Sequence, residues 1–286
     1  GNTYNSYWGY QDGDIRNSRT REIEEPIFML NHYWNLSEKT TLNTNVAYQF
    51  GKIGNSRLDF GGQTQYTTSS GDIYYAGGGA SPDPTYWRYL PSYYLGFDDP
   101  DYTGAYLAQQ AFLSDGQINW NAMYAANIAA RANGQNAIYA LYEDRTDDKQ
   151  LSFNSILNTE LAENITLDAS VNYTRLKSHN FARVLDLLGA ESYLDVDGFA
   201  DDADFMVAQS NTLTPNRAVR EGDTFRYNFN LFANTIDGFA QAQFKYNKVD
   251  FYLGGTFGRT VYQREGLYEN GYFQNSDPTT ASSFGK

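Results

Sequence analysis

The residues from Thr40 to Phe50 alternate between two faces with a period of two. A period of two over about ten residues predicts a β-strand. The pattern fits two environments, because an apolar face points into the core of a soluble sandwich but outward to lipid in a membrane barrel. The apolar face carries Leu42, Thr44, Val46, Tyr48 and Phe50, and the other face carries Thr41, Asn43, Asn45, Ala47 and Gln49.

Three segments of the chain share one form, in which two alternating strands are separated by a very short polar break. The strand from Ile165 to Thr174 has the cleanest alternation. Alternating strands joined by such short breaks predict three antiparallel hairpins, about six strands in all. The breaks are Ser37-Glu38-Lys39, Ala162-Glu163-Asn164 and Asn247-Lys248.

The connections between these segments are much longer than the breaks inside them. They run over residues 51–149 and 178–223, and compact soluble domains rarely tolerate loops of this length. Short turns that alternate with long loops are typical of an outer-membrane barrel, whose turns face the periplasm and whose loops face outside. This asymmetry favours lipid around the apolar face. Aromatic residues near strand ends fit interfacial girdles, with ordinary β-propensity as the alternative: Trp34, Tyr48, Phe50, Tyr173 and Tyr246.

About six strands are too few to cross a membrane as a closed barrel. An open sheet in lipid leaves unpaired N–H and C=O groups along each edge, and each such group costs several kcal/mol. The chain begins with a loop-like sequence, without an initiator Met or a visible signal peptide. We therefore expect residues 1–286 to be an all-β, antiparallel segment of a larger transmembrane barrel with long extracellular loops.

Composition narrows the classes of function. The chain has no Cys, which excludes a disulfide framework and a CxxC zinc or redox site. A net charge of -13 makes nucleic acid a poor partner, because phosphate contacts need clustered Lys and Arg. The mean hydropathy of -0.61 and the lack of a long apolar run exclude a membrane-spanning helix, but not a barrel. An aromatic content of 16% suits β structure with rings at a boundary.

The first long connection is rich in aromatic rings and holds the candidates for contacts with a ligand. Rings set among prolines and acidic residues can form a stacking or hydrogen-bonding surface at a barrel mouth. The alternative is that they only pack the loop against itself and its neighbours. Further along, alanines between residues 122 and 130, followed by Gly134, predict a short helix. The ligand-contact candidates are Trp87, Tyr89, Tyr93, Tyr94 and Trp120.

Two acidic clusters resemble a metal site only in part. Oxygen ligands at odd spacing followed by Gly198 form half of a calcium loop, but the third Asp and the closing Glu at EF-hand spacing are missing. We therefore expect solvated acidic loops and no metal site. The clusters are Asp195, Asp197, Asp201, Asp202 and Asp204 in the second connection, and Asp98, Asp99 and Asp101 in the first.

The sequence offers little support for an enzyme. His32 lies in a strand pattern and His179 at a strand-to-loop exit, with no Cys and no GxSxG motif. Asp168 and Glu160 on the polar face can be taken as paired carboxylates, but the lumen walls of barrels are polar in any case. The glycine run at residues 77–79 lacks the helix and the Lys of a phosphate loop. We expect no catalytic residue and no cofactor.

The strand–turn–strand segments at residues 33–51, 157–178 and 239–271 resemble the mid-barrel region of TonB-dependent outer-membrane receptors of the Bacteroidetes type. The variant they resemble carries a carboxypeptidase-regulatory-like domain ahead of the plug. The resemblance implies that residues 1–286 are part of one barrel domain of about 22 strands in the bacterial outer membrane. It also implies uptake of a scarce nutrient with energy supplied through TonB. The implied partners are the rest of the barrel and its plug, the TonB system, outer-membrane lipid, a nutrient ligand and, as an option, a surface lipoprotein.

Neither a plug nor a TonB-contacting segment is present in this sequence, and no functional residue transfers from the resemblance. Two rival interpretations remain beside the receptor. One is a passive porin or a structural or secretion-associated barrel, although a porin usually has shorter loops and a charged constriction. The other is a soluble, secreted β-sandwich that binds a ligand. The sequence does not identify the transported molecule.

Overall fold

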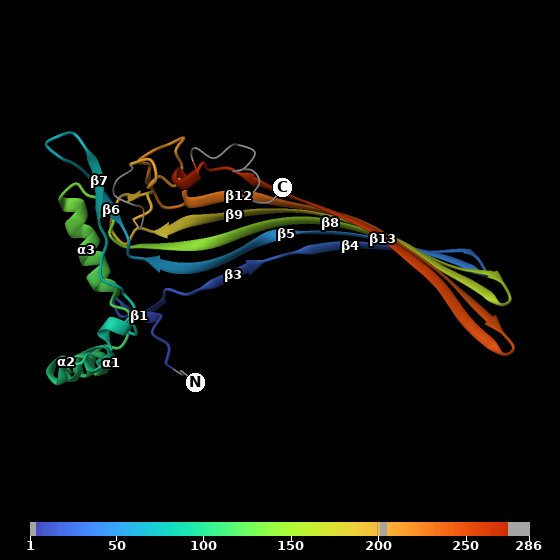
Figure 1. Cartoon of the computed structure of the whole chain (residues 1–286), viewed down its shortest axis with the longest axis horizontal. Helices are drawn as coiled ribbons and strands as arrows, with labels where there is room; N and C mark the ends of the chain where they lie inside the picture. The colour runs from blue at the N-terminus through green and yellow to red at the C-terminus, as the bar shows by residue number, and fades with distance from the viewer. Residues whose placement is uncertain (1–3, 199, 201–204, 274–286) are drawn as a thin grey trace.

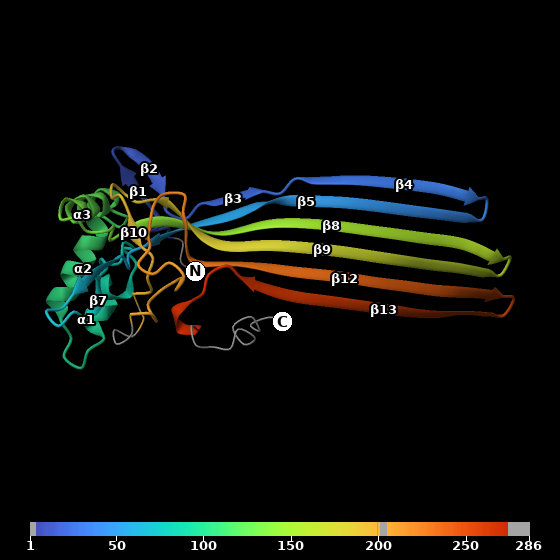
Figure 2. The same cartoon turned by 90° about the horizontal axis from the view of Figure 1, so that it is seen from above.

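The computed structural model describes residues 4–198, 200 and 205–273, and it is mainly antiparallel β. Its long strands form one seven-stranded sheet in the order β13-β12-β9-β8-β5-β3, with β4 also paired to β5. Figure 1 shows this sheet edge-on as a long curved layer, and Figure 2 shows its strands side by side. The strands are β3 (Arg21–Glu24), β4 (Ile27–Ser37), β5 (Thr40–Asp59), β8 (Ala140–Ala162), β9 (Ile165–Asp186), β12 (Thr224–Tyr246) and β13 (Val249–Gly266).

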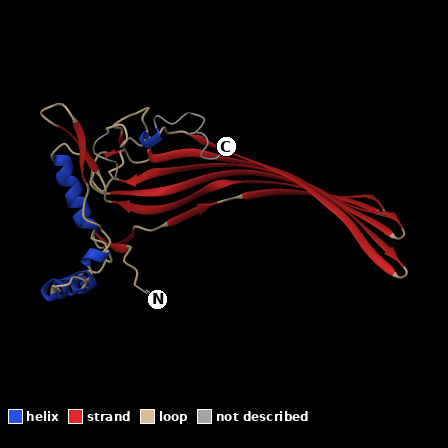
Figure 3. Cartoon of the chain, viewed as in Figure 1, coloured by secondary structure: helices blue, strands red, loops and turns tan. Residues whose placement is uncertain are grey.

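The three predicted hairpins are confirmed. Strands β4 and β5, β8 and β9, and β12 and β13 each pair antiparallel around a two-residue break. All three turns lie at the same end of the sheet, opposite the helices (Figure 3). β3 continues the edge strand on the far side of Pro26, whose missing N–H interrupts the ladder. The breaks are Glu38-Lys39, Glu163-Asn164 and Asn247-Lys248.

The strands run further toward the long connections than the alternation predicts. β5 continues to Asp59 and β8 begins at Ala140, while β9 continues to Asp186. The backbone pairing continues through these extensions, and ion pairs join side chains of neighbouring strands there. The extensions lack the clean apolar alternation of the turn-proximal strands, and that is why the sequence pattern misses them. Lys52 lies 2.8 Å from Glu22, and Arg183 lies 2.8 Å from Glu143.

The connections are folded, not extended coil. The predicted helix is confirmed as α3 (Trp120–Ala132), with Asn119 accepting from Ala122 N at its start and Gly134 at φ +71 after its end. The other elements are β1 (Trp8–Gln11), β2 (Asp14–Asn17), β6 (Gln63–Thr67), β7 (Ile73–Gly77), η1 (Trp87–Tyr89), α1 (Pro91–Leu95), α2 (Tyr102–Ser114), β10 (Tyr193–Leu194), β11 (Ala218–Val219) and η2 (Gly271–Phe273). Within the described residues, no helix has the length and apolar character needed to cross a membrane.

The register places the alternating apolar side chains of neighbouring strands on one face of the sheet, here called the apolar face. Val46 pairs with Phe153, which pairs with Tyr173, which pairs with Ile236. In the part of the chain that the structure describes, every buried apolar side chain lies outside the turn-proximal half of the sheet, residues 27–50, 149–177 and 231–262. Leu253, on the apolar face, is 74% exposed. The apolar face is therefore uncovered, and the buried core lies at the end that carries the connections.

Candidate functional site at the connection end of the sheet

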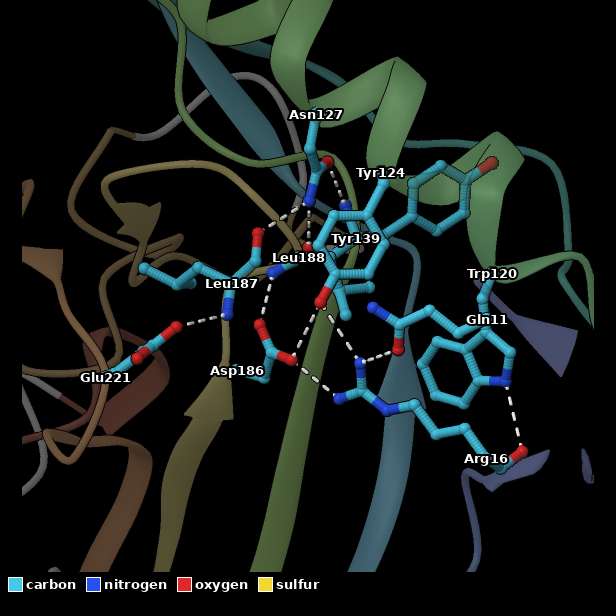
Figure 4. Close-up of polar contacts among 10 residues, drawn as sticks. All are labelled: Gln11, Arg16, Trp120, Tyr124, Asn127, Tyr139, Asp186, Leu187, Leu188 and Glu221. Carbon is cyan, nitrogen blue, oxygen red and sulfur yellow. Dashed lines mark hydrogen bonds and ion pairs between the residues drawn. The ribbon is translucent and has the colours of Figure 1, made fainter. Parts of the chain in front are cut away.

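Helix α3 is fixed to the sheet by the side chain of Asn127, which is fully buried. Its Nδ2 donates to the backbone oxygens of Tyr139 and Leu187, each over 2.8 Å. Its Oδ1 accepts from Ile138 N at 2.9 Å and from Tyr139 N at 3.0 Å. Figure 4 shows this amide between the helix and the ends of the strands. One side chain thus joins α3 to the start of β8 and the end of β9.

A second contact joins the β1–β2 hairpin to the same place through Arg16 (Figure 4). Its Nη2 lies 2.6 Å from Asp186 Oδ2, and its Nη1 donates to Tyr124 OH at 3.1 Å and to Gln11 Oε1 at 2.7 Å. The guanidinium lies 4.2 Å from the ring centroid of Trp120, whose Nε1 donates to Arg16 O. Charge-assisted and cation–π contacts therefore fix the position of α3 from two sides.

A charged side chain, Arg226, lies beside a bulge in β12, where it covers buried aromatic rings and stays partly exposed to solvent. Arg226 has a left-handed backbone, with φ at +63, where the register between β9 and β12 shifts. Its Nη2 lies 2.9 Å from Asp59 Oδ2, and its guanidinium lies 5.0 Å from the ring of Tyr142. Its backbone N donates to Asp195 Oδ1 at 2.8 Å. The strain of a non-glycine residue in this region is compensated by these contacts.

The second acidic cluster agrees only in part with the expected solvated loop, because Asp197 is exposed as predicted whereas Asp195 is buried. Asp195 is 3% exposed, and burial raises the pKa of its carboxyl group. The prediction of solvent exposure was wrong for this residue, because its carboxylate supports the backbone of Arg226. Asp201, Asp202 and Asp204 lie outside the described residues. Among the residues that the structure describes, no group of three or more His, Asp or Glu side chains is placed to hold a metal ion.

The aromatic residues of the first connection pack edge-to-face on one another. The ring of Tyr93 lies 5.0 Å from Trp87, 5.3 Å from Tyr94 and 5.1 Å from Phe97. Tyr89 hydrogen-bonds through its OH to Ser81 O at 3.1 Å, and burial raises the pKa of this phenol. The ring of Tyr86 lies 5.3 Å from Tyr89 and 6.0 Å from Trp87 and so joins Tyr89 to this cluster. Four of the five ligand-contact candidates therefore lie together: Trp87, Tyr89, Tyr93 and Tyr94.

Only part of this aromatic cluster is open to a ligand. Trp87 is 53% exposed, with Arg88 over its ring at 5.0 Å, whereas Tyr89, Tyr93 and Tyr94 are partly covered. Trp120 lies apart from the four and is fully buried in the contact with Arg16. Trp87 is therefore the most exposed of the four clustered candidates, and Trp120 acts as a core residue.

The sequence interpretation did not anticipate α1 and α2. The signal is present in Asp101, whose side chain accepts from Gly104 N and caps α2, and in the helix-forming residues that follow. The aromatic residues of the segment mask this helical pattern. The helix pair exposes further apolar side chains: Leu95, Phe97, Tyr102, Tyr106, Leu107 and Leu113.

The residues considered for catalysis have separate partners. His179 Nε2 lies 2.6 Å from Asn228 Oδ1, inside β9 and not at its exit as predicted. Asp168 accepts from Asn158 at 2.5 Å, and Glu160 lies 3.9 Å from Lys39. Asp168 therefore has a neutral amide as its partner and Glu160 has a cation.

A row of amides crosses the polar face of the sheet, and the sequence alone did not reveal it. Asn45 Nδ2 donates to Asn154 Oδ1 at 3.0 Å, and Asn154 donates to Asn172. Asn172 Nδ2 then donates to Asp237 Oδ2 at 2.6 Å. Four strands are linked by side chains at one level, and each amide points its donor toward the terminal carboxylate.

These features define a class of structure, a long antiparallel sheet with short turns at one end and ordered, partly helical connections at the other. A scan against models of known protein families found no match, and a search of curated proteins found no relative. The assignment of function therefore depends on the residues and their arrangement.

Proposed function

We propose that this chain is part of an outer-membrane barrel that works as a receptor or transporter and takes up a scarce nutrient. The observation that carries the proposal is the uncovered apolar face in the turn-proximal half of the sheet. Lipid is the environment that suits such a face, because exposing it to water is unfavourable at about 25 cal/mol per Å².

The lengths of the strands support a membrane boundary part-way along the sheet. β8 has 23 residues, and at about 3.3 Å per residue it spans roughly 75 Å. A bilayer has a hydrocarbon core of about 30 Å, which a tilted strand crosses in about ten residues. The apolar alternation occupies about that length next to the turns, and the charged pairs Lys52–Glu22 and Arg183–Glu143 follow it. The sheet thus has one zone for lipid and one for solvent.

The ordered connections favour a receptor over a passive porin. Residues 60–139 fold into helices and a hairpin, and α3 is fixed by Asn127 and Arg16. A receptor uses such structure to position ligand contacts above a lumen. Trp87, with its exposed ring, is the leading contact residue. The plug, the use of TonB and a surface lipoprotein partner follow only from the resemblance.

Conductance separates the two functions. The full-length barrel that contains this chain is purified and reconstituted in a planar bilayer with potassium chloride. A plugged receptor gives no stable open conductance, whereas a passive porin gives a large steady one. Uptake that stops when the proton gradient is collapsed would further support energy supplied through TonB, and continued uptake would contradict it.

A further inference from the structure

The apolar face ends in a basic residue on each of four strands. Reading from the turns toward the connections, the first cation on this face is Lys52 on β5, Lys149 on β8, Arg175 on β9 and Arg259 on β13. On β12 the corresponding side chain is Asn234, which pairs with Arg175. These five residues are here called the boundary row.

The boundary row does not follow the hydrogen-bonded register, and it slants across the sheet in three steps of two residues, with no step between β9 and β12. Lys52 pairs with Asp147, so Lys149 lies two residues nearer the turns. Lys149 pairs with Lys177, so Arg175 lies two residues nearer again.

The last step has the same size and direction. Arg175 pairs with Asn234, and Asn234 pairs with Val261. Arg259 is again two residues nearer the turns than Val261. From β5 to β13 the boundary thus moves six residues toward the turns in all, in one direction, with no step between β9 and β12.

The slant has a magnitude that can be compared with membrane barrels. Three steps of two residues correspond to about 20 Å along the strands, and four strand spacings to about 19 Å across them. A straight boundary with these components lies at about 45° to the register, which is the tilt of strands in transmembrane barrels, about 35–45°. A flat bilayer surface produces such a straight boundary on a tilted sheet.

We infer that the boundary row marks the surface of one leaflet, with Lys149, Arg175 and Arg259 binding the phosphates of lipid headgroups. The inference rests on the proposed membrane barrel and names the partner of its apolar face. All three side chains are exposed, and none forms an ion pair within the described part of the chain. Long basic side chains at this level keep their stems on apolar surface and their charges at the headgroups. Lys52 is already paired with Glu22 and contributes less.

The depth of single labels tests the slant. The chain has no Cys, so bimane can be attached at introduced cysteines in the full-length barrel and quenched by lipids brominated at known depths. Phe50 and Phe257 each precede the boundary on their own strand, so their labels lie at equal depth. Gln263 lies level with Phe50 in the backbone pairing, because Phe50 pairs with Lys149, Lys149 with Lys177, Lys177 with Phe232 and Phe232 with Gln263. Its label lies about 13 Å further from the bilayer centre, given a 45° tilt.

The outcomes separate this inference from the proposed function. Equal depth for labels at Phe50 and Gln263 overturns the slanted boundary while leaving the barrel intact. Absence of quenching at all three positions overturns the membrane barrel itself, and the inference with it.

Charge reversal tests the phosphate contact. The triple variant Lys149→Glu, Arg175→Glu, Arg259→Glu is compared with wild type in vesicles of phosphatidylcholine, with and without phosphatidylglycerol. Anionic lipid increases the folded fraction of wild type. Each reversal lowers this preference by more than about fivefold, because the loss of one basic residue at a charged surface alone accounts for about fivefold and the new negative charge adds repulsion. Arg220→Glu, at an exposed cation in the second connection, leaves the preference unchanged. A triple variant that keeps the wild-type preference overturns the contact.

Discussion

Replacing Asn127 with Ala tests whether one amide holds α3 on the sheet. The change orphans two backbone N–H groups, of Ile138 and Tyr139, and removes a donor from the carbonyls of Tyr139 and Leu187, of which Leu187 O keeps its bond from Ala190 N. A buried group without a partner costs about 1–3 kcal/mol. Water entering the vacated volume can satisfy part of the set, so two lost partners give a working figure of about 3 kcal/mol. The better helix propensity of Ala returns at most about 0.7 kcal/mol.

The effect is local and is best measured by hydrogen exchange of the α3 amides. A loss of about 3 kcal/mol corresponds to roughly a 150-fold faster exchange if α3 opens as a unit. Exchange in β12 and β13 stays unchanged, because Asn127 has no contact with these strands among its hydrogen bonds. Asn133→Ala is the matched control, since it removes one exposed hydrogen bond at the end of the same helix. If the two variants exchange α3 amides at the same rate, the anchoring role of Asn127 is refuted.

Three further outcomes are expected in denaturant titrations of the protein reconstituted in lipid vesicles. Val171→Arg on the apolar face costs about 2–4 kcal/mol, whereas Ser170→Arg on the polar face costs clearly less, and equal costs count against lipid contact. Trp120→Ala lowers stability by about 3–5 kcal/mol through its buried ring, while Trp87→Ala costs about 1 kcal/mol or less and instead weakens ligand binding. Burial raises the folded-state pKa of Asp195, so stability falls as pH rises from about 4 through the raised pKa; Asp195→Asn flattens this profile, and an unchanged profile contradicts the assignment.

The sequence predicts the hairpins well, because alternation and turn composition are local properties. The strand from Ile165 to Thr174 and the break at Asn247-Lys248 appear in the structure as predicted. The strand extensions do not follow from local pattern, since the pairing of Arg183 with Glu143 joins residues on different strands. Helix α3 is recognisable by its alanines, whereas α2 is hidden by its aromatic residues.

The sequence predicts the candidate site less well than the hairpins. The aromatic content correctly marks a clustered segment around Tyr93. It cannot separate Trp120 from Trp87, because burial depends on Arg16, which lies far away in the chain. For a related reason the sequence does not reveal Arg226 and wrongly places Asp195 in a solvated loop, since a bulge in β12 brings the two together. Ion pairs and bulges need the register, and the register across connections of this length is set by tertiary contacts.

The amide row on the polar face explains how the register of the sheet would be selected if, as proposed, its other face contacts lipid. Lipid is nearly uniform along its thickness, so a two-residue slip keeps the apolar side chains outward and costs little on that side. The same slip moves Asn154 away from Asn45 and Asn172, and each lost side-chain hydrogen bond costs about 0.5–1.5 kcal/mol. The terminal bond from Asn172 to Asp237 is charge-assisted and costs more to lose. Specific pairing of these strands therefore comes from the polar face, whereas in the proposed barrel the boundary row on the apolar face sets the placement relative to the bilayer.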